Sequence, residues 1–239
     1  MADPSVPLMQ IYSTLVADHG QLGWWPGRSR FEIIVGAILT QNTAWRNVER
    51  AIASLRSRGW LRPEAMARVP SSRLAEAVRS SGHFRQKGRK LKAFLEYLDR
   101  RHAGKLGRMA RLATSDLRRE LLDIWGIGQE TADSILLYAF GRSVFVVDTY
   151  THRLLHRHGL HPGGGYEPVR HFLERHIPPR PELYNDFHAQ IVWVGHRYCG
   201  TKPRCDVCPL ESLLPRGGPV PDVRPNCRDI KPRSSSRRN

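Results

Sequence analysis

Apolar residues recur at spacings of three and four along most of this 239-residue chain, which is the pattern of amphipathic helices. The pattern predicts helices at residues 8–19, 30–40, 45–58, 62–68, 71–80, 86–102, 114–123, 129–140, 166–176 and 181–197, and another directly after residue 148. The clearest strand signal is 144–147, and this run is too short and isolated to form a sheet. We therefore expect an all-α protein.

A short glycine turn, Gly126-Ile127-Gly128, interrupts the helical pattern near the middle of the chain. Two glycines around one apolar residue let the backbone turn sharply and approach a ligand closely. The helix that restarts at Gln129 directs unpaired N–H groups and the positive end of its dipole across the turn, where a backbone phosphate fits. Glu130 and Asp148 supply carboxylates nearby in the sequence. The alternative is a core helical hairpin whose acids are merely solvated.

Two further breaks carry residues of interest. Trp24 and Trp25 are adjacent in an irregular Pro- and Gly-rich segment, so at least one of them is expected to face a cleft, although two packed core aromatics would also satisfy the pattern. A polar break at Gln41-Asn42-Thr43 separates the apolar helix 30–40, where Gly36 would allow close packing, from the helix that begins at Trp45.

Charge narrows the class of partner. The chain has 38 Lys and Arg residues against 22 Asp and Glu residues, a net charge of +16, which suggests a polyanionic partner. A basic turn containing Lys87 and Arg89 is a candidate contact to a DNA backbone, or else a solvated helix start. No apolar run approaches the roughly 18–20 residues of a membrane helix, and no secretion signal is visible, so we expect a cytoplasmic, nucleoid-associated protein.

All four cysteines lie near the C-terminus, in the spacing Cys199-x5-Cys205-x2-Cys208-x18-Cys227. Clustered cysteines in a reducing compartment point to a metal site before disulfides. Four thiolates suit a tetrahedral zinc ion or a [4Fe–4S] cluster, and buried free thiols are the remaining alternative.

Taken together, these motifs resemble the endonuclease III superfamily of base-excision DNA glycosylases, which carry a helix-hairpin-helix and a downstream catalytic aspartate. The similar segments are Leu122-x3-Gly126-Ile127-Gly128-x2-Thr131-Ala132, Val146-Val147-Asp148-Thr149, Ile38-Leu39-Thr40-Gln41-Asn42-Thr43, and the cysteines from Cys199 to Cys208. The resemblance covers roughly residues 8–214. It implies a two-lobed fold: a six-helix barrel lobe at 26–134 with its hairpin at about 115–134, and a cysteine-cluster lobe from 1–25 plus 135–214. Residues 215–239 would form a Pro/Arg/Ser-rich, partly disordered extension.

Two departures from the family pattern matter. Bifunctional members carry a lysine directly before the Thr-Ala of the hairpin, and this chain has Glu130 there, so no Schiff base and no strand-cleaving lyase step are expected at that position. In the cysteine loop the first gap is one residue short, and Leu214 stands where the fourth cysteine is expected, so Cys227 would have to complete a [4Fe–4S] cluster. The alternatives are zinc or no metal.

The resemblance also assigns roles within a monofunctional branch that includes 3-methyladenine glycosylases. It implies that Trp24, Trp25 and Trp45 line the base pocket, that Gln41 fills the gap left by the flipped nucleotide and that Asn42 also contacts DNA. Residues Gly126 to Gln129 would hold the DNA backbone. Asp148 would stabilise charge on the deoxyribose and orient water while also serving as a helix N-cap, and Glu130 would set specificity or simply favour its helix N-terminus.

The expected activity is removal of 3-methyladenine or another alkylated purine from double-stranded DNA by a monomeric enzyme, because the Glu130 carboxylate complements a cationic purine. Stacking on tryptophan is favourable for such a base but admits uracil as well. A closely similar branch removes uracil and other deaminated bases. A bifunctional glycosylase/lyase for oxidised pyrimidines and a non-catalytic binder of damaged DNA are the remaining alternatives.

Overall fold

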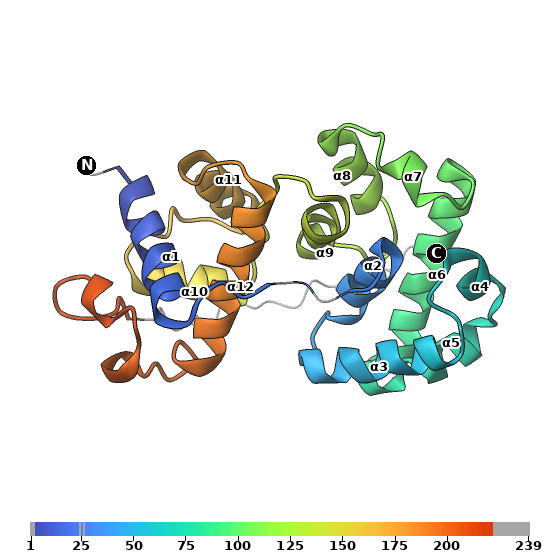
Figure 1. Cartoon of the computed structure of the whole chain (residues 1–239), viewed down its shortest axis with the longest axis horizontal. Helices are drawn as coiled ribbons and strands as arrows, with labels where there is room; N and C mark the ends of the chain where they lie inside the picture. The colour runs from blue at the N-terminus through green and yellow to red at the C-terminus, as the bar shows by residue number, and fades with distance from the viewer. Residues whose placement is uncertain (1–2, 24, 26, 222–239) are drawn as a thin grey trace, which may run out of the picture.

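The computed structural model of the chain describes residues 3–23, 25 and 27–221, and this part is built from helices and connecting segments without a β-strand (Figure 1). The prediction of an all-α fold is therefore confirmed. The helices are α1 (Ser5–His19), α2 (Arg30–Leu39), α3 (Trp45–Ser57), α4 (Pro63–Arg68), α5 (Ser71–Ala77), α6 (Phe84–His102), α7 (Leu106–Met109), α8 (Thr114–Leu122), α9 (Gln129–Ser134), α10 (Thr149–Arg157), α11 (Tyr166–His176) and α12 (Pro181–Arg197).

The apolar faces of these helices bury into two hydrophobic clusters. One cluster joins residues of α2 to α9, and the other joins α1 with α10, α11 and α12. Figure 1 shows the same division, with α1 and α10–α12 gathered on one side and α2–α9 on the other. A π-helical segment, Ile135–Ala139, continues α9 and feeds both clusters: Ile135 and Leu136 pack into the first, Leu137 and Tyr138 into the second. This segment therefore lies where the two hydrophobic clusters meet.

The run 144–147 is extended and unpaired, as its shortness predicted. Its apolar side chains are buried, and the backbone N–H of Phe145 donates to Glu174 Oε1 at 2.9 Å, which replaces a sheet partner. The run ends at Asp148, where α10 begins. The buried strand-like segment thus holds Asp148 in place.

A buried ion network ties α9 to the second cluster. The Asp133 carboxylate has no exposed surface and accepts two hydrogen bonds from the Arg118 guanidinium, at 2.7 and 3.0 Å, and one from the Tyr166 hydroxyl at 2.9 Å. Arg118 also donates to Glu167 at 2.5 Å. Because Arg118 lies on α8 and Tyr166 and Glu167 lie on α11, one carboxylate joins three helices.

Several predicted boundaries differ from the structure. The helix predicted at 71–80 ends at Ala77 and is followed by a 3-10 turn, Arg79–Ser81, and the helix predicted at 129–140 changes to π geometry after Ser134. Cys227 and most of the predicted C-terminal extension lie outside the described residues, and the predicted lobe boundaries stay predictions. Among the described residues, no helix is long and apolar enough to cross a membrane.

The contact of α5 with α6 gives a first test of the packing. A Cβ added to Gly88 would meet the Ala75 Cβ at 3.0 Å and its Cα at 3.1 Å. Gly→Ala inside a helix normally stabilises by about 0.5–1 kcal/mol, but overpacking at this contact should cost about 1–3 kcal/mol. We expect Gly88→Ala to lower the free energy of unfolding in urea. Gly107→Ala is the matched control because nothing lies within 4 Å of its Cβ; equal effects at both sites would contradict the close packing.

Candidate active site

The glycine turn forms a tight hairpin between α8 and α9. Gly126 has a φ of 84°, a left-handed conformation that favours glycine, and a Cβ there would lie 2.6 Å from the Lys90 side chain. The Ile127 side chain is buried, whereas Gly128 faces open space and is the N-cap of α9. Ile127 therefore anchors the hairpin in the core, and only its backbone side can approach a ligand.

Gln41 is bound to this hairpin. Its amide donates to the Gly126 carbonyl at 3.1 Å and to Thr131 Oγ1 at 2.9 Å, and its carbonyl accepts from Lys90 Nζ. The next residue, Asn42, is exposed and has a φ of 53°. A non-glycine residue in this left-handed region is uncommon and is held there by its surroundings. The predicted pair Gln41 and Asn42 thus borders the hairpin, with Gln41 held and Asn42 presented outward.

Of the two basic side chains predicted to contact DNA, Arg89 is exposed and Lys87 is buried. Arg89 is exposed, and its guanidinium lies 4.6 Å over the ring of Trp125, which is itself 51% exposed. Lys87 is 2% exposed, and its ammonium donates to the Ser81 carbonyl inside the first cluster. Burial lowers the pKa of Lys87 to about 8. The prediction that Lys87 contacts DNA does not hold, because its side chain lies on the apolar face of α6.

Asp148 stands at the N-terminus of α10 as its cap. Its Oδ1 accepts from the Thr151 backbone N–H at 2.8 Å and from the Thr151 hydroxyl at 2.9 Å, which forms a capping box. Its Oδ2 lies 3.7 Å from Nε2 of the buried His188. The capping box occupies one carboxylate oxygen, and the side chain remains partly exposed. The same residue can therefore cap a helix and face a substrate.

Glu130 lies in the first turn of α9 and interacts electrostatically with Asp148. Its side chain reaches solvent, yet surrounding protein partly desolvates it, as in a cleft. This desolvation, with a smaller contribution from the Asp148 charge, raises the pKa of Glu130 to about 7. Near neutral pH the site therefore holds a carboxyl that exchanges a proton readily, a property common in acid–base sites.

Aromatic side chains form a wall that is connected to Asp148 through Tyr138 and His188. Trp25 stacks on Tyr138, with ring centroids 4.9 Å apart and planes at 24°, and meets Trp45 edge-on at 4.8 Å. Trp25 also lies against Gly36, where a Cβ would come within 3.2 Å of the indole nitrogen. Trp24 lies outside the described residues.

A cavity of about 380 Å³ opens beside this wall. Trp25, Trp45 and the ion pair Glu32–Arg56 line it, but Glu130 and Asp148 do not. Tyr138 connects the two sides, because its ring stacks on Trp25 and its hydroxyl lies 2.6 Å from Nδ1 of His188, the neighbour of Asp148.

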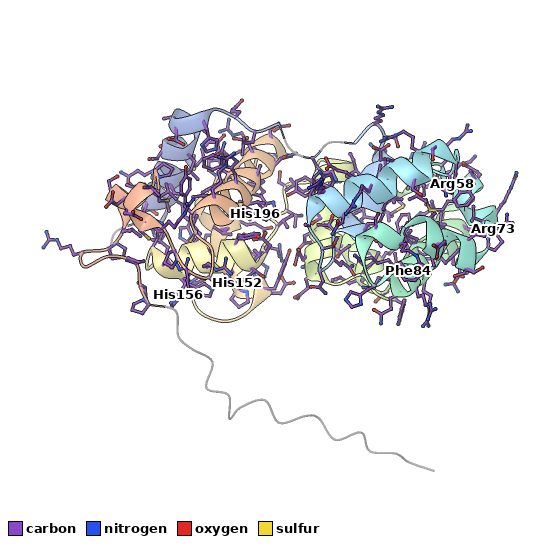
Figure 2. All side chains as sticks on the ribbon, turned by 90° about the horizontal axis from the view of Figure 1, so that it is seen from below. Arg58, Arg73, Phe84, His152, His156 and His196 are labelled. Carbon is purple, nitrogen blue, oxygen red and sulfur yellow. The ribbon has the colours of Figure 1, made fainter. Side chains whose placement is uncertain are left out.

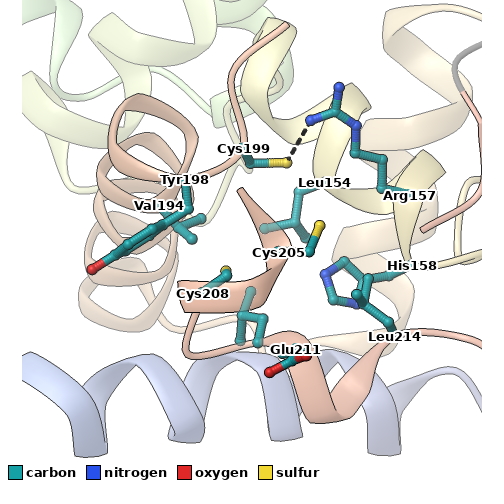
Figure 3. A pocket seen from close by; sticks show the side chains of 11 residues that line it. Leu154, Arg157, His158, Val194, Tyr198, Cys199, Cys205, Cys208, Glu211 and Leu214 are labelled. Carbon is teal, nitrogen blue, oxygen red and sulfur yellow. Dashed lines mark hydrogen bonds between the residues drawn. The ribbon is translucent and has the colours of Figure 1, made fainter. Parts of the chain in front are cut away.

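Three of the predicted cysteines converge on a second pocket, between α10, α12 and the following loop (Figure 3). Cys199, Cys205 and Cys208 line it, and the Arg157 guanidinium donates to Cys199 Sγ at 3.2 Å. Burial, followed by nearby thiols, raises the pKa of Cys205, and burial raises that of Cys208 to about 11. Neutral thiols at this spot become stable ligands when a metal supplies positive charge.

At the fourth ligand position this chain has Leu214, where the family pattern has a cysteine. Leu214 lines the pocket, and so does His158, whose imidazole points toward Cys205 in Figure 3. His158 Nδ1 lies 3.2 Å from the Leu213 carbonyl, so it donates there and leaves Nε2 as a lone-pair donor. No three His, Cys, Asp or Glu side chains among the described residues are close enough to share one metal ion. Cys199, Cys205, Cys208 and His158 thus line one pocket, but they do not have the spacing that a single shared metal ion needs.

Sequence reasoning missed Tyr138, His188 and Asp133. A tyrosine, a histidine and an aspartate inside apolar helices give no periodic signal that separates them from ordinary core residues. It also missed a histidine-rich face on α10 and α12. Figure 2 shows His152, His156 and His196 on this face, and His152 lies 2.9 Å from His161.

Comparisons with known proteins agree with this arrangement. Residues 35–179 match the HhH-GPD superfamily of base excision DNA repair proteins. A protein of Methanocaldococcus jannaschii named as a DNA repair glycosylase is 40% identical over 212 residues, covering 86% of this chain and 94% of that protein.

Two solved structures are similar as well. The 3-methyladenine DNA glycosylase of H. pylori, bound to 1,N6-ethenoadenine, superposes with a TM-score of 0.72 at 28% identity, covering 82% of this chain and 98% of that one. An endonuclease III–DNA complex superposes with a TM-score of 0.75 at 23% identity, covering 91% of this chain and 97% of that one. These matches confirm the resemblance and the all-α fold inferred from the sequence.

The raised pKa of Glu130 predicts how stability depends on pH. The unfolded residue ionises near its ordinary value of 4.5 and the folded residue near 7, so the folded state loses stability as pH rises through this range. We expect Glu130→Gln to be more stable than the parent protein at pH 8 and equally stable at pH 4.5, measured by urea unfolding at both pH values. Glu96→Gln, an exposed acid on α6, is the control; a Glu130→Gln gain that persists unchanged at pH 4.5 would contradict the assignment.

Proposed function

This chain belongs to the HhH-GPD superfamily of base excision DNA repair proteins, and on that premise we propose that it is a monofunctional DNA glycosylase for alkylated purines. The observation that carries the proposal is the electrostatic pairing of Glu130 with Asp148, which is linked to the aromatic wall through His188 and Tyr138. The enzyme flips a damaged base from duplex DNA, hydrolyses its N-glycosidic bond and leaves an abasic site.

The absence of a lyase step is supported by the chemistry of the hairpin helix. A Schiff base needs an unprotonated amine at the sugar, and Glu130 offers a carboxyl where bifunctional relatives have lysine. The nearby Lys90 ammonium is bonded to the Gln41 carbonyl beneath the hairpin. Water, rather than an amine, is therefore the nucleophile that this site supports.

The choice of an alkylated purine rests on the pocket and on one relative. Trp25 and Trp45 line the cavity and would stack on a flat base there, and stacking on indole favours a cationic base in particular. A carboxyl at Glu130 complements the same positive charge. The similar H. pylori enzyme is a 3-methyladenine glycosylase that was solved with 1,N6-ethenoadenine. Stacking alone would admit uracil, which makes a deaminated base the second candidate.

DNA binding depends on charge and on the hairpin. The net charge of +16 attracts the duplex without reading sequence, and the backbone of Gly126 to Gln129 would hold a phosphate at the start of α9. Arg89, stacked on the exposed Trp125, adds a contact beside the hairpin. Asn42 points outward from its left-handed backbone and would enter the space of the flipped nucleotide, with Gln41 exchanging its hairpin bonds for bonds to DNA.

The two carboxyls would have different roles in the chemical step. Cleavage of the N-glycosidic bond builds positive charge on the deoxyribose, as in glycoside hydrolysis generally. Ionised Asp148 would stabilise that charge through Oδ2 and orient the attacking water. Glu130, whose pKa lies near 7, would donate a hydrogen bond to the base when protonated or accept one when ionised.

We also propose that the cysteine pocket holds a [4Fe–4S] cluster, bound by Cys199, Cys205, Cys208 and His158. When bound, the cluster would fix the loop that follows α12 as a structural clamp. Arg157 would remain a hydrogen-bond donor to the Cys199 sulfur. We place the enzyme, as a monomer, on chromosomal DNA in the cytoplasm.

The function is tested with a panel of duplexes carrying 1,N6-ethenoadenine, hypoxanthine, uracil or thymine glycol, together with dimethyl-sulfate-treated DNA as a source of 3-methyladenine. We expect the fastest base release from the alkylated purines, and strand breakage only after alkali. Breakage without alkali, or a covalent adduct trapped by borohydride on abasic DNA, would show lyase activity and overturn the monofunctional assignment.

Asp148→Asn is the matched inactive variant in this panel. Asparagine is as good an N-cap as aspartate, so the fold and DNA affinity should persist while base release falls by at least about 100-fold. Turnover retained in Asp148→Asn would remove Asp148 from the mechanism.

The cluster proposal is tested by iron and acid-labile sulfide content and by visible absorbance of the purified protein. We expect the parent protein and Cys227→Ala to be brown and to carry both, whereas Cys205→Ser and His158→Ala lose them. Loss in Cys227→Ala with retention in His158→Ala would make Cys227 the fourth ligand, and a colourless protein containing zinc would contradict the iron cluster.

A further inference from the structure

His188 is a buried histidine directly behind the candidate catalytic carboxylate. It lies on α12, is 5% exposed, and stands between two polar groups of other elements. Its Nδ1 is 2.6 Å from the Tyr138 hydroxyl, and its Nε2 is 3.7 Å from Asp148 Oδ2. Nε2 has no hydrogen-bond partner and is shielded from solvent. A buried polar atom without a partner is costly, so the position calls for an explanation.

The surroundings allow one protonation state of the ring. Burial lowers the pKa of His188, so the imidazole is neutral and carries a single N–H. If Nδ1 carried the proton, the Nε2 lone pair would face the Asp148 carboxylate, and two acceptors would be opposed. If the Tyr138 hydroxyl donates to Nδ1, the proton lies on Nε2 and faces Oδ2. The charge of Asp148 and the phenol therefore select the same tautomer.

Asp148 leaves one oxygen for this contact. Oδ1 is held by the backbone N–H and hydroxyl of Thr151, whereas Oδ2 faces His188. At 3.7 Å the Nε2–Oδ2 contact is longer than a hydrogen bond, but contacts of this kind commonly tighten when a substrate binds.

We propose that His188 is a positioning residue for Asp148, that its Nε2–H sets the direction in which Oδ2 faces the sugar, and that Tyr138 fixes the tautomer that makes this possible. The proposal rests on the catalytic role proposed for Asp148. It assigns no substrate contact to His188, which acts through the carboxylate.

The same chain contains a matched control. His102 on α6 is also 5% exposed and lies 2.9 Å from the Tyr97 hydroxyl and 2.9 Å from Glu120 Oε2, which forms a second tyrosine–histidine–carboxylate set in the other hydrophobic cluster. His102→Leu removes a buried histidine of the same kind away from Asp148. It therefore separates loss of packing from loss of positioning.

The experiment measures single-turnover base release across pH, and binding to duplex DNA with a stable abasic analogue. We expect His188→Leu to slow release by about tenfold or more, in the range found for residues that orient a reactive group, with DNA affinity within about twofold of the parent protein. Tyr138→Phe, which keeps the ring and its stacking on Trp25, should slow release in the same direction by a smaller factor. His188→Gln, which retains an N–H donor, should recover part of the loss.

The pH profile separates positioning from packing. Removing a donor from the Asp148 carboxylate disfavours its ionised form, so the acid limb of the profile should shift to higher pH in His188→Leu and stay in place in His102→Leu. The other titratable groups near Asp148 are Glu130 on α9, Tyr150 and His152 on α10, and Tyr138, and all but Tyr138 are unchanged in every variant compared. An unmoved acid limb, with a rate equal to that of His102→Leu, would overturn the proposal.

A measurement that does not depend on activity distinguishes failure of the His188 proposal from failure of the proposed function. Long-range ¹⁵N–¹H NMR spectra of the histidine rings should show His188 as the Nε2–H tautomer in the parent protein and a mixture in Tyr138→Phe. An Nδ1–H ring in the parent protein overturns the inference about His188. Failure of the parent protein to release any base overturns the proposed function instead, and the tautomer result then stands by itself.

Discussion

The Asp133 carboxylate is the interaction on which the rest of the site depends. It is fully buried on α9, three residues after Glu130, and is satisfied by a bidentate Arg118 from α8 and by Tyr166 from α11. A buried charge without such partners would be strongly destabilising, so the three helices must meet in this geometry. The hairpin, the helix that carries Glu130 and the segment that leads to Asp148 are therefore placed together by one network.

The π-helical segment after α9 joins the two hydrophobic clusters and places Tyr138 between them. This segment contributes side chains to both hydrophobic clusters. It holds Tyr138 where the ring stacks on Trp25, which packs against the second cluster and meets Trp45 of the first, and where the hydroxyl reaches His188 on α12. A widened helical turn is a frequent feature of functional sites, since it redirects a side chain without ending the helix. Tyr138 and His188 thus connect the aromatic wall to Asp148.

The helices and the glycine hairpin could be predicted from the sequence because periodicity and turn chemistry are local properties. The network around Asp133 and the contacts of His188 could not, since their members lie far apart in the chain and look like core residues. Lys87 is a different case: with Leu91, Phe94 and Leu98 it falls on one helical stripe, so its position was readable from the same periodicity that placed the helix. The basic composition of the turn obscured that signal.

Asp148 links the stability of the fold to the proposed chemistry. One oxygen caps α10, and the proposed mechanism leaves the other for the substrate, so the capping box removes rotational freedom from the carboxylate before any DNA binds. Preorganisation of this kind lowers the cost of bringing a charge to the developing cation. It also limits which residues are tolerated at this position: a neutral cap preserves α10 but loses the charge, and a longer carboxylate keeps the charge but loses the cap. Under the proposed mechanism, this position therefore favours aspartate on two independent grounds, one from the helix and one from the reaction.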